Sequence, residues 1–261
     1  MEESRIIITA VMFFLLGSVV GAFGTLVGIG GGLILVPVFL WVFGYPAQQT
    51  IGTSLFIVLL NAISGTWAYI QQKKVFFHAA IRFGLATIPG AFLGSYIATY
   101  FTGATFSLTF GIFLVLMALV MYFKSSKEQA VHSFDPRTFR YNSLLGIVSS
   151  LGVGFISSIL GVGGGIIHVP MMIYLLGFPT HVATATSTCV LALSSFVGVI
   201  SHFILGHVLW VPGLFIGIGA IFGAQIGAKI ASKTKPRAII TLLSLIVFIM
   251  GIKFIMSGIT D

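Results

Sequence analysis

Apolar runs of about 20 residues recur from one end of this sequence to the other, the length that crosses the hydrocarbon core of a bilayer as a helix. The composition agrees, because 57% of the 261 residues are hydrophobic and only 7% are charged. A β-barrel would instead show short segments of alternating polarity. We therefore predict an all-α polytopic protein of the cell membrane.

The positive net charge does not indicate nucleic acid. The net charge is +8, and the basic residues lie in short loops, where orientation in a membrane explains them better. The single cysteine, Cys189, excludes an internal disulfide. The first apolar run leads directly into a glycine-rich motif, so we interpret it as part of the fold and not as a signal peptide.

This glycine-rich stretch occurs twice. Residues 24–40 read GTLVGIGGGLILVPVFL, and residues 157–173 read SSILGVGGGIIHVPMMI. Each copy has three consecutive glycines and then a proline, a combination that makes a poor continuous helix. In a lipid-embedded chain such a break is tolerated only where protein or a water-filled cavity surrounds it. We expect the two breaks to form the binding site.

The glycine motif belongs to a longer internal repeat. The first half predicts hydrophobic segments at 6–27, 33–43, 48–72, 77–101 and 106–123, of which the second is too short to span alone. After a polar linker the pattern restarts, and one constant offset without a gap aligns Gly28 with Gly161 and the rest of the first half with the second. The predicted units are a first transmembrane repeat at 1–124, a cytoplasmic linker at 125–140 and a second repeat at 141–261.

Loop charge orients the repeats. The loop at Lys73-Lys74 is basic and its counterpart at Gly206-His207 has no Lys or Arg, whereas after the fourth segment only the second half is basic. Because cytoplasmic loops carry the excess Lys and Arg, the two repeats are predicted to be inverted. Inversion requires an odd number of crossings in each half. Five crossings, ten in all, fit best; the alternative is three plus a broken or re-entrant pair formed by the first two segments.

The doubled motif G-x-G-G-G-x-x-x-V-P, from Gly28 to Pro37 and from Gly161 to Pro170, resembles the sulfite exporter TauE/SafE family, also called the 4-toluene sulfonate uptake permease family. The openings of the third segments, Gly52-Thr53-Ser54 and Ala185-Thr186-Ser187, are similar to a second motif of that family. The resemblance covers nearly the whole chain. It implies transport of sulfur-containing or organic anions such as sulfite, sulfoacetate or related sulfonates, in either direction.

The residue chemistry independently favours an anion. All five acidic residues lie in the tails or the linker, and a site without carboxylates does not repel an anion. Backbone N–H groups at helix N-termini and hydroxyl groups can attract one. The alternatives are that the glycines serve only helix packing and that the hydroxyls bond to their own backbone. The predicted substrate-binding residues are Gly30, Gly31, Gly32, Thr53, Ser54, Gly163, Gly164, Gly165, Thr186 and Ser187.

Four further residues are candidates for the pathway or for coupling. His168 lies inside the second motif opposite Leu35, which makes it an asymmetric candidate for proton coupling. Asn61 and Gln225 either line the path or bridge helices. Arg82 either attracts anions from the cytoplasm or extends to the membrane interface.

The leading hypothesis is therefore a secondary transporter that works by alternating access. An anion channel is the alternative, and a membrane-embedded enzyme or a scaffold is disfavoured, because no catalytic set or paired metal ligands are evident. We predict no catalytic residue, cofactor or metal. The expected partners are a small anion, the lipid bilayer and a proton for coupling, but no nucleic acid. The oligomeric state is left open, with a homodimer as one alternative.

Overall fold

The computed structural model describes residues 2–100, 103–124, 138–234 and 236–260. These residues form helices joined by short loops, and the described part of the chain contains no strand. Most of the predicted linker lies outside the described residues, so the unit boundaries stay a prediction. The helices are α1 (Glu2–Val27), α2 (Gly32–Pro37), the π-helix η1 (Val38–Val42), α3 (Ala47–Gln71), α4 (Phe77–Ala98), α5 (Gly103–Lys124), α6 (Ser143–Leu160), α7 (Gly165–Tyr174), α8 (Thr180–Ile204), α9 (Trp210–Ala231) and α10 (Pro236–Thr260).

Helix bounds follow the repeat found in the sequence. Helices α3 and α8 begin and end at equivalent positions of the two halves, and so do α4 and α9. Helices α1 and α6 likewise end at equivalent positions, Val27 and Leu160. The short second segment differs from a plain helix, because Pro37 lacks an N–H group and the chain continues from it as η1.

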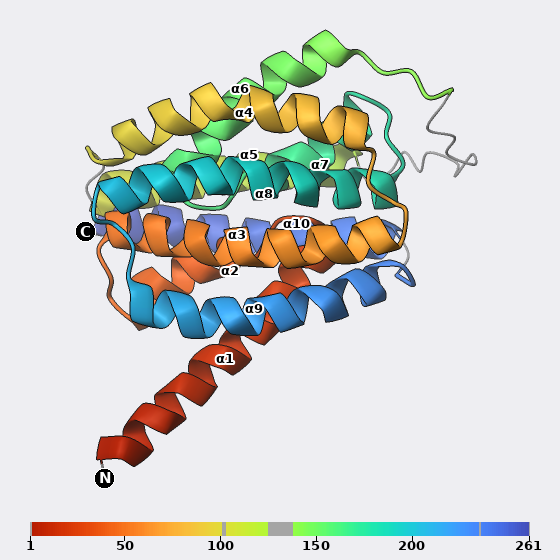
Figure 1. The fold of residues 1–261 in the computed structure, drawn as a ribbon. Coiled ribbons are helices and arrows are strands. Elements are labelled where there is room, and N and C mark those ends of the chain that lie inside the picture. Colours follow the sequence, from red (N-terminus) through yellow and green to blue (C-terminus); the bar gives the residue numbers. More distant parts are fainter. Residues whose placement is uncertain (1, 101–102, 125–137, 235, 261) are drawn as a thin grey trace.

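Two helices occupy the centre of the molecule. Of their most apolar stretches, 72% is buried in α3 and 61% in α8, against 17% in α1. Figure 1 shows α6, α4, α8, α3, α9 and α1 following one another from top to bottom, and each helix packs against the next in this order. Helices α5 and α10 form a further packed pair. This arrangement places α3 and α8 beside both glycine-rich breaks.

Equivalent loops of the two halves lie at opposite ends of the molecule. In Figure 1 the loop between α3 and α4 lies at the right, whereas the loop between α8 and α9 lies at the left. The basic loop residues Lys73 and Lys74 follow α3, and Lys233 follows α9. All three therefore lie at the right-hand end in this view.

Small residues allow the outer helices to pack closely. A Cβ atom added to Gly90 of α4 would lie 2.7 Å from the backbone nitrogen of Phe155 in α6. The equivalent atom on Gly223 of α9 would lie 2.7 Å from the backbone nitrogen of Ala22 in α1. Such contacts leave no room for a side chain, so these glycines serve helix packing.

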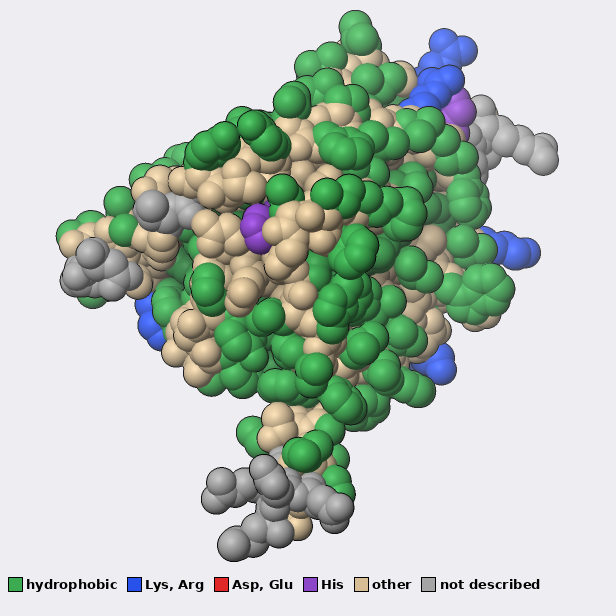
Figure 2. Space-filling view, turned by 60° about the vertical axis from the view of Figure 1, so that its left-hand side comes forward, with side chains coloured by type: hydrophobic (Ala, Val, Ile, Leu, Met, Phe, Trp, Pro, Cys, Tyr) green, Lys and Arg blue, Asp and Glu red, His purple; other side chains and the backbone are tan. Residues whose placement is uncertain are grey.

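The surface fits a polytopic membrane protein. Among the described residues, seven helices are long and apolar enough to cross a membrane. Figure 2 shows hydrophobic side chains over much of one face of the molecule, with Lys and Arg only at its margins. Apolar side chains exposed in this manner are stable against lipid.

Candidate functional site

The two glycine motifs break the chain in the same way. Gly28, Gly30 and Gly31 have φ angles of 82°, 83° and 86°, and the equivalent Gly161, Gly163 and Gly164 have 71°, 80° and 73°. This left-handed region is accessible to glycine at little cost. Helices α2 and α7 begin directly after the breaks, at Gly32 and Gly165. Each motif therefore leads into a helix N-terminus.

The structure brings the two breaks into backbone contact. A Cβ atom added to Gly32 would lie 2.8 Å from the carbonyl oxygen of Gly161. One added to Gly165 would lie 2.7 Å from the Cα atom of Ile29. Gly32 and Gly165 are equivalent in the repeat, so the two motifs meet face to face through corresponding positions.

The two serines that were predicted to bind substrate each donate a hydrogen bond to the glycine-rich break of the other half. Ser54 Oγ donates to the carbonyl oxygen of Gly161 at 2.9 Å. Ser187 Oγ donates to the carbonyl oxygen of Gly28 at 3.2 Å. Both side chains are buried. Because a hydroxyl group has one proton, these serines hold the breaks and have no second proton to give to a ligand.

Other orphan carbonyl groups at the broken helix ends are also satisfied. Tyr69 Oη donates to the carbonyl oxygen of Thr25 at 2.7 Å, and His202 Nε2 lies 3.2 Å from the carbonyl oxygen of Ser158. The last turn of a helix leaves such acceptors without an intrahelical donor. Tyr69 and His202 occupy equivalent positions in the repeat, so unlike side chains perform the same task.

The two predicted threonines hold loops of the opposite half. Thr53 Oγ1 accepts a hydrogen bond from the backbone nitrogen of Leu209 at 2.9 Å. Thr186 Oγ1 accepts one from the backbone nitrogen of Phe76 at 3.0 Å. Leu209 and Phe76 directly precede α9 and α4. Unlike the serines, each threonine accepts in this contact.

Two apolar side chains lie against both breaks. A Cβ atom added to Gly163 would lie 2.6 Å from Val58 Cγ1 and 2.8 Å from Leu191 Cδ1. The same two side chains are the nearest neighbours of Gly30. Val58 of α3 and Leu191 of α8 are equivalent in the repeat, and both are fully buried. One symmetric apolar pair therefore contacts a glycine of each break.

Sequence reasoning missed two buried hydroxyl groups on α8. Thr184 Oγ1 and Ser195 Oγ have no hydrogen-bond partner among the described residues, although the two residues are only 2% and 0% exposed. Their equivalents on α3 are Ile51 and Ala62. Comparing the two halves position by position would have singled out both residues.

His168 lies in the contact between α7 and α6. Its side chain is buried, and Nε2 lies 3.1 Å from Ser150 Oγ. Ser150 Oγ in turn donates to the carbonyl oxygen of Gly146 at 2.6 Å. Because that hydroxyl proton is already used, Nε2 of His168 is the donor to Ser150. The equivalent Leu35 packs in an apolar cluster with Phe39.

The two predicted amides bridge helices. Gln225 Nε2 of α9 donates at 2.8 Å both to the carbonyl oxygen and to Oγ of Ser64 in α3. With its amide in the orientation that satisfies both ends, Asn61 donates to the carbonyl oxygens of Gly21 and Ala220 at 3.0 and 3.2 Å. These contacts favour the bridging interpretation over the pathway interpretation.

Arg82 lies away from the breaks. Its side chain is exposed on α4, and Nη1 donates to Ser143 Oγ at 3.2 Å. One turn earlier, His78 Nδ1 lies 3.0 Å from Tyr141 Oη. The structure therefore places Arg82 at an end of the molecule, beside the start of α6.

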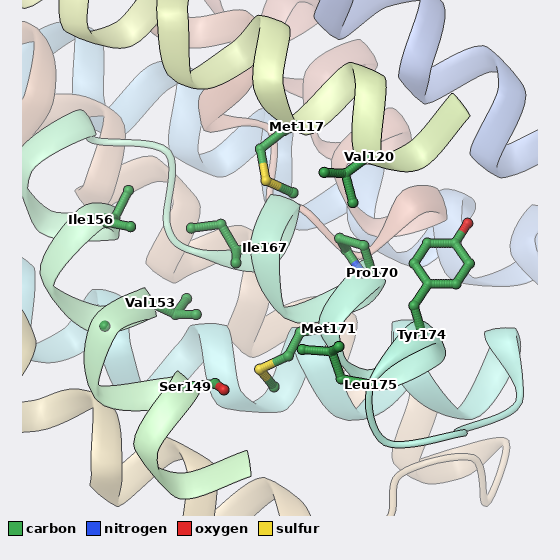
Figure 3. Close-up of a pocket in the computed structure, with 11 residues that line it drawn as sticks. Met117, Val120, Ser149, Val153, Ile156, Ile167, Pro170, Met171, Tyr174 and Leu175 are labelled. Carbon is green, nitrogen blue, oxygen red and sulfur yellow. The ribbon is translucent and has the colours of Figure 1, made fainter. Parts of the chain in front are cut away.

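A groove between α5, α6 and α7 has a different character from the breaks. It encloses about 320 Å³ and its lining includes Met117, Ile156, Ile167 and Met171. Figure 3 shows these apolar side chains converging from the three helices. Such a lining suits hydrocarbon rather than an anion.

Comparison with known proteins identifies the family of the chain. The family model described as "Sulfite exporter TauE/SafE" matches residues 13–254. The probable membrane transporter protein YunE of Bacillus subtilis is 33% identical, covering 95% of this chain and 98% of its own. The probable membrane transporter protein MJ0441 of Methanocaldococcus jannaschii is 28% identical, with 96% and 97% covered. No solved structure matches. The chain thus belongs to the sulfite exporter TauE/SafE family of membrane transporters.

Proposed function

We propose that the protein is a secondary transporter of small sulfur-containing or organic anions, with sulfite, sulfoacetate and related sulfonates as the substrate class. The observation that carries the proposal is the backbone contact between two glycine breaks that each lead into a helix N-terminus. Helix N-termini present unpaired N–H groups and partial positive charge. Sulfonate and sulfite oxygens accept hydrogen bonds from such donors.

The charge distribution supports an anion over a cation. No acidic residue occurs between residues 4 and 127 or between 136 and 260. Carriers that bind cations within the membrane usually rely on intramembrane carboxylates. In this proposal Gly31, Gly32, Gly163 and Gly164 bind the substrate through their backbone. The N–H groups of Gly30 and Gly165 already donate to the carbonyl oxygens of Gly24 and Gly163, at 3.1 and 3.0 Å. The predicted serines position these glycines, and Thr53 and Thr186 tie the neighbouring loops to them.

The same proposal includes two inverted repeats. Equivalent helices share their bounds, and the loops between α3 and α4 and between α8 and α9 lie at opposite ends. Both observations support ten hydrophobic segments related by a pseudo-two-fold axis in the membrane plane. A reporter inserted at Lys73 and one at Lys233 should map to the cytoplasm, and one at Gly206 should map to the outside. Opposite sides for Lys73 and Lys233 would refute the inversion.

Alternating access requires movement at the centre. Val58 and Leu191 lie against both Gly30 and Gly163, one glycine of each break. Each state of the carrier would expose the breaks to one side when these two side chains separate from one of the motifs. A channel would need both sides open at once.

The deciding experiment measures flux. Purified protein in liposomes should take up sulfite or sulfoacetate with saturation, tested with and without a pH gradient. Empty liposomes and a cation such as sodium serve as controls. Flux that rises linearly with concentration and ignores the gradient would favour the channel. Absence of flux for every anion tested would refute the transport proposal.

A further inference from the structure

One face of α8 carries hydroxyl groups through the centre of the molecule. Thr184, Thr188, Leu191 and Ser195 follow one another at spacings of four, three and four residues, which places them on one side of a helix. All four side chains are buried. The equivalent residues of α3 are entirely apolar: Ile51, Leu55, Val58 and Ala62. The halves therefore differ in polarity along the line where they meet.

This face of α8 contacts both breaks. A Cβ atom added to Gly28 would lie 3.0 Å from Thr184 Cγ2, and one added to Gly163 would lie 3.4 Å from Ser195 Oγ. Thr188 lies between them, and its Oγ1 donates to the carbonyl oxygen of Thr184 at 2.9 Å. The two ends of the hydroxyl line thus adjoin the first break and the second break, respectively.

The hydroxyl groups at both ends lack a partner. Thr184 Oγ1 and Ser195 Oγ are buried without a hydrogen bond, whereas Thr188 Oγ1 is satisfied. Burial of an unpaired hydroxyl group is unfavourable, and the large majority of buried polar atoms are paired. An anion bound beside either of them would accept its unused proton, since a hydroxyl group donates more strongly to a charged acceptor.

We propose that the substrate anion binds off the pseudo-symmetry axis, on the α8 side, beside the second break, with Ser195 as a hydrogen-bond donor. The inference rests on the proposed transport function and deepens it by assigning side chains to the site. Ser195 adjoins the second break, so it and the N-terminus of the ten-residue helix α7 can hold one oxyanion together. Thr184 lies eleven residues earlier on the same face, about 16 Å along the helix axis, so its hydroxyl group does not reach the same small anion.

The first break has no such donor in the corresponding place. Ala62, the equivalent of Ser195, packs in an apolar cluster with Val58 and Leu191. The atoms nearest to a Cβ added at Gly30 therefore belong to Leu191 and Val58, whereas those nearest to one added at Gly163 include Ser195 Oγ. This asymmetry indicates that the anion binds more tightly beside the second break than beside the first.

The test combines transport with stability in three variants. Ser195→Ala and Thr184→Val each remove an unpaired hydroxyl group with little change of shape. Ser194→Ala is the matched control, because its buried Oγ bonds to the carbonyl oxygen of Leu191 at 3.3 Å within α8. We expect the KM for sulfite to rise about tenfold or more in Ser195→Ala, as for a lost bond to a charged group. Thr184→Val should leave the KM unchanged, because its hydroxyl group lies about 16 Å away along α8. The KM of the control should not change.

The melting temperature of each variant distinguishes a role in substrate binding from a role in protein stability. Because neither hydroxyl group has a partner in the protein, the melting temperatures of Ser195→Ala and Thr184→Val should equal or exceed that of the wild type. An unchanged KM in Ser195→Ala, with wild-type flux intact, would overturn this inference and leave the proposed function standing. A raised KM together with a lowered melting temperature would also overturn it. Absence of flux in the wild type would overturn both.

Discussion

Ser54 was predicted to bind substrate, but its hydrogen bond points to a structural role that a single substitution can test. Its Oγ donates to the buried carbonyl oxygen of Gly161 in the other half of the chain at 2.9 Å. In Ser54→Ala that carbonyl group loses this donor inside the protein. Leaving a buried acceptor unpaired costs about 1–3 kcal/mol.

The equivalent residue supplies an internal comparison. Ser187 makes the same contact with Gly28 at 3.2 Å, which is long for a bond between a hydroxyl group and an oxygen. Ser187→Ala should therefore destabilise the protein less than Ser54→Ala. For a domain of this size each kcal/mol lowers the melting temperature by about 2–4 °C. We expect a loss of about 2–12 °C for Ser54→Ala, following from the same free-energy range.

The assay is thermal unfolding of the purified protein in detergent, followed by flux in liposomes at a temperature well below unfolding. Ser194→Ala again serves as the control, because its hydroxyl group bonds only within α8. The KM for sulfite should change little in Ser54→Ala, since its proton is not available to the substrate. A raised KM at an unchanged melting temperature would refute this reasoning and return Ser54 to the substrate-binding set.

Three further predictions concern packing, coupling and pH. On α6, Gly154→Ala should lower the melting temperature, because its Cβ atom would lie 2.8 Å from Thr87 Cα. Gly152→Ala is the control, because no neighbouring atom lies within 4 Å of its Cβ position, and its melting temperature should be unchanged or higher. Equal melting temperatures of the two variants would contradict this packing. His168→Leu should retain anion flux but lose its response to a pH gradient, measured in liposomes; a retained response would exclude His168 as the coupling residue. Burial lowers the pKa of His207, in the loop after α8, below the ordinary histidine value of about 6.5. Below that pH the unfolded state binds more protons than the folded state, so the stability of the protein falls as the pH falls. His207→Asn should therefore reduce the difference in melting temperature between pH 7.5 and pH 5, and an unchanged difference would contradict this reasoning.

The helices and the breaks could be predicted from sequence because their causes are local. Length and hydrophobicity set the helices, and the glycine motifs set the breaks, which the structure places at Gly28–Gly31 and Gly161–Gly164. Within the breaks the positive φ angles fall on glycines, because glycine has no Cβ atom to disfavour this region. The constant offset of the repeat even predicted that α3 and α8 would have equivalent bounds.

The roles of individual hydroxyl groups could not be predicted, because they depend on contacts between distant parts of the chain. Ser54 and Gly161 are 107 residues apart in sequence, so no local pattern reveals that their groups are bonded. The same holds for Thr53 and Leu209, which are 156 residues apart. Ser195 escaped notice for the opposite reason, since a serine in an apolar helix is usually interpreted as bonded to its own backbone.

Comparison of equivalent positions in the two halves distinguishes residues that stabilise the fold from residues that are suited to bind a ligand. A carrier built from two inverted repeats must fasten both breaks comparably, because each half takes the place of the other during alternating access. The fastening contacts do occur as equivalent pairs: Ser54 with Ser187 and Tyr69 with His202. A substrate is under no such constraint, because one anion needs only one set of donors. The unpaired hydroxyl group of Ser195 occurs in one half only, so it falls into the second class.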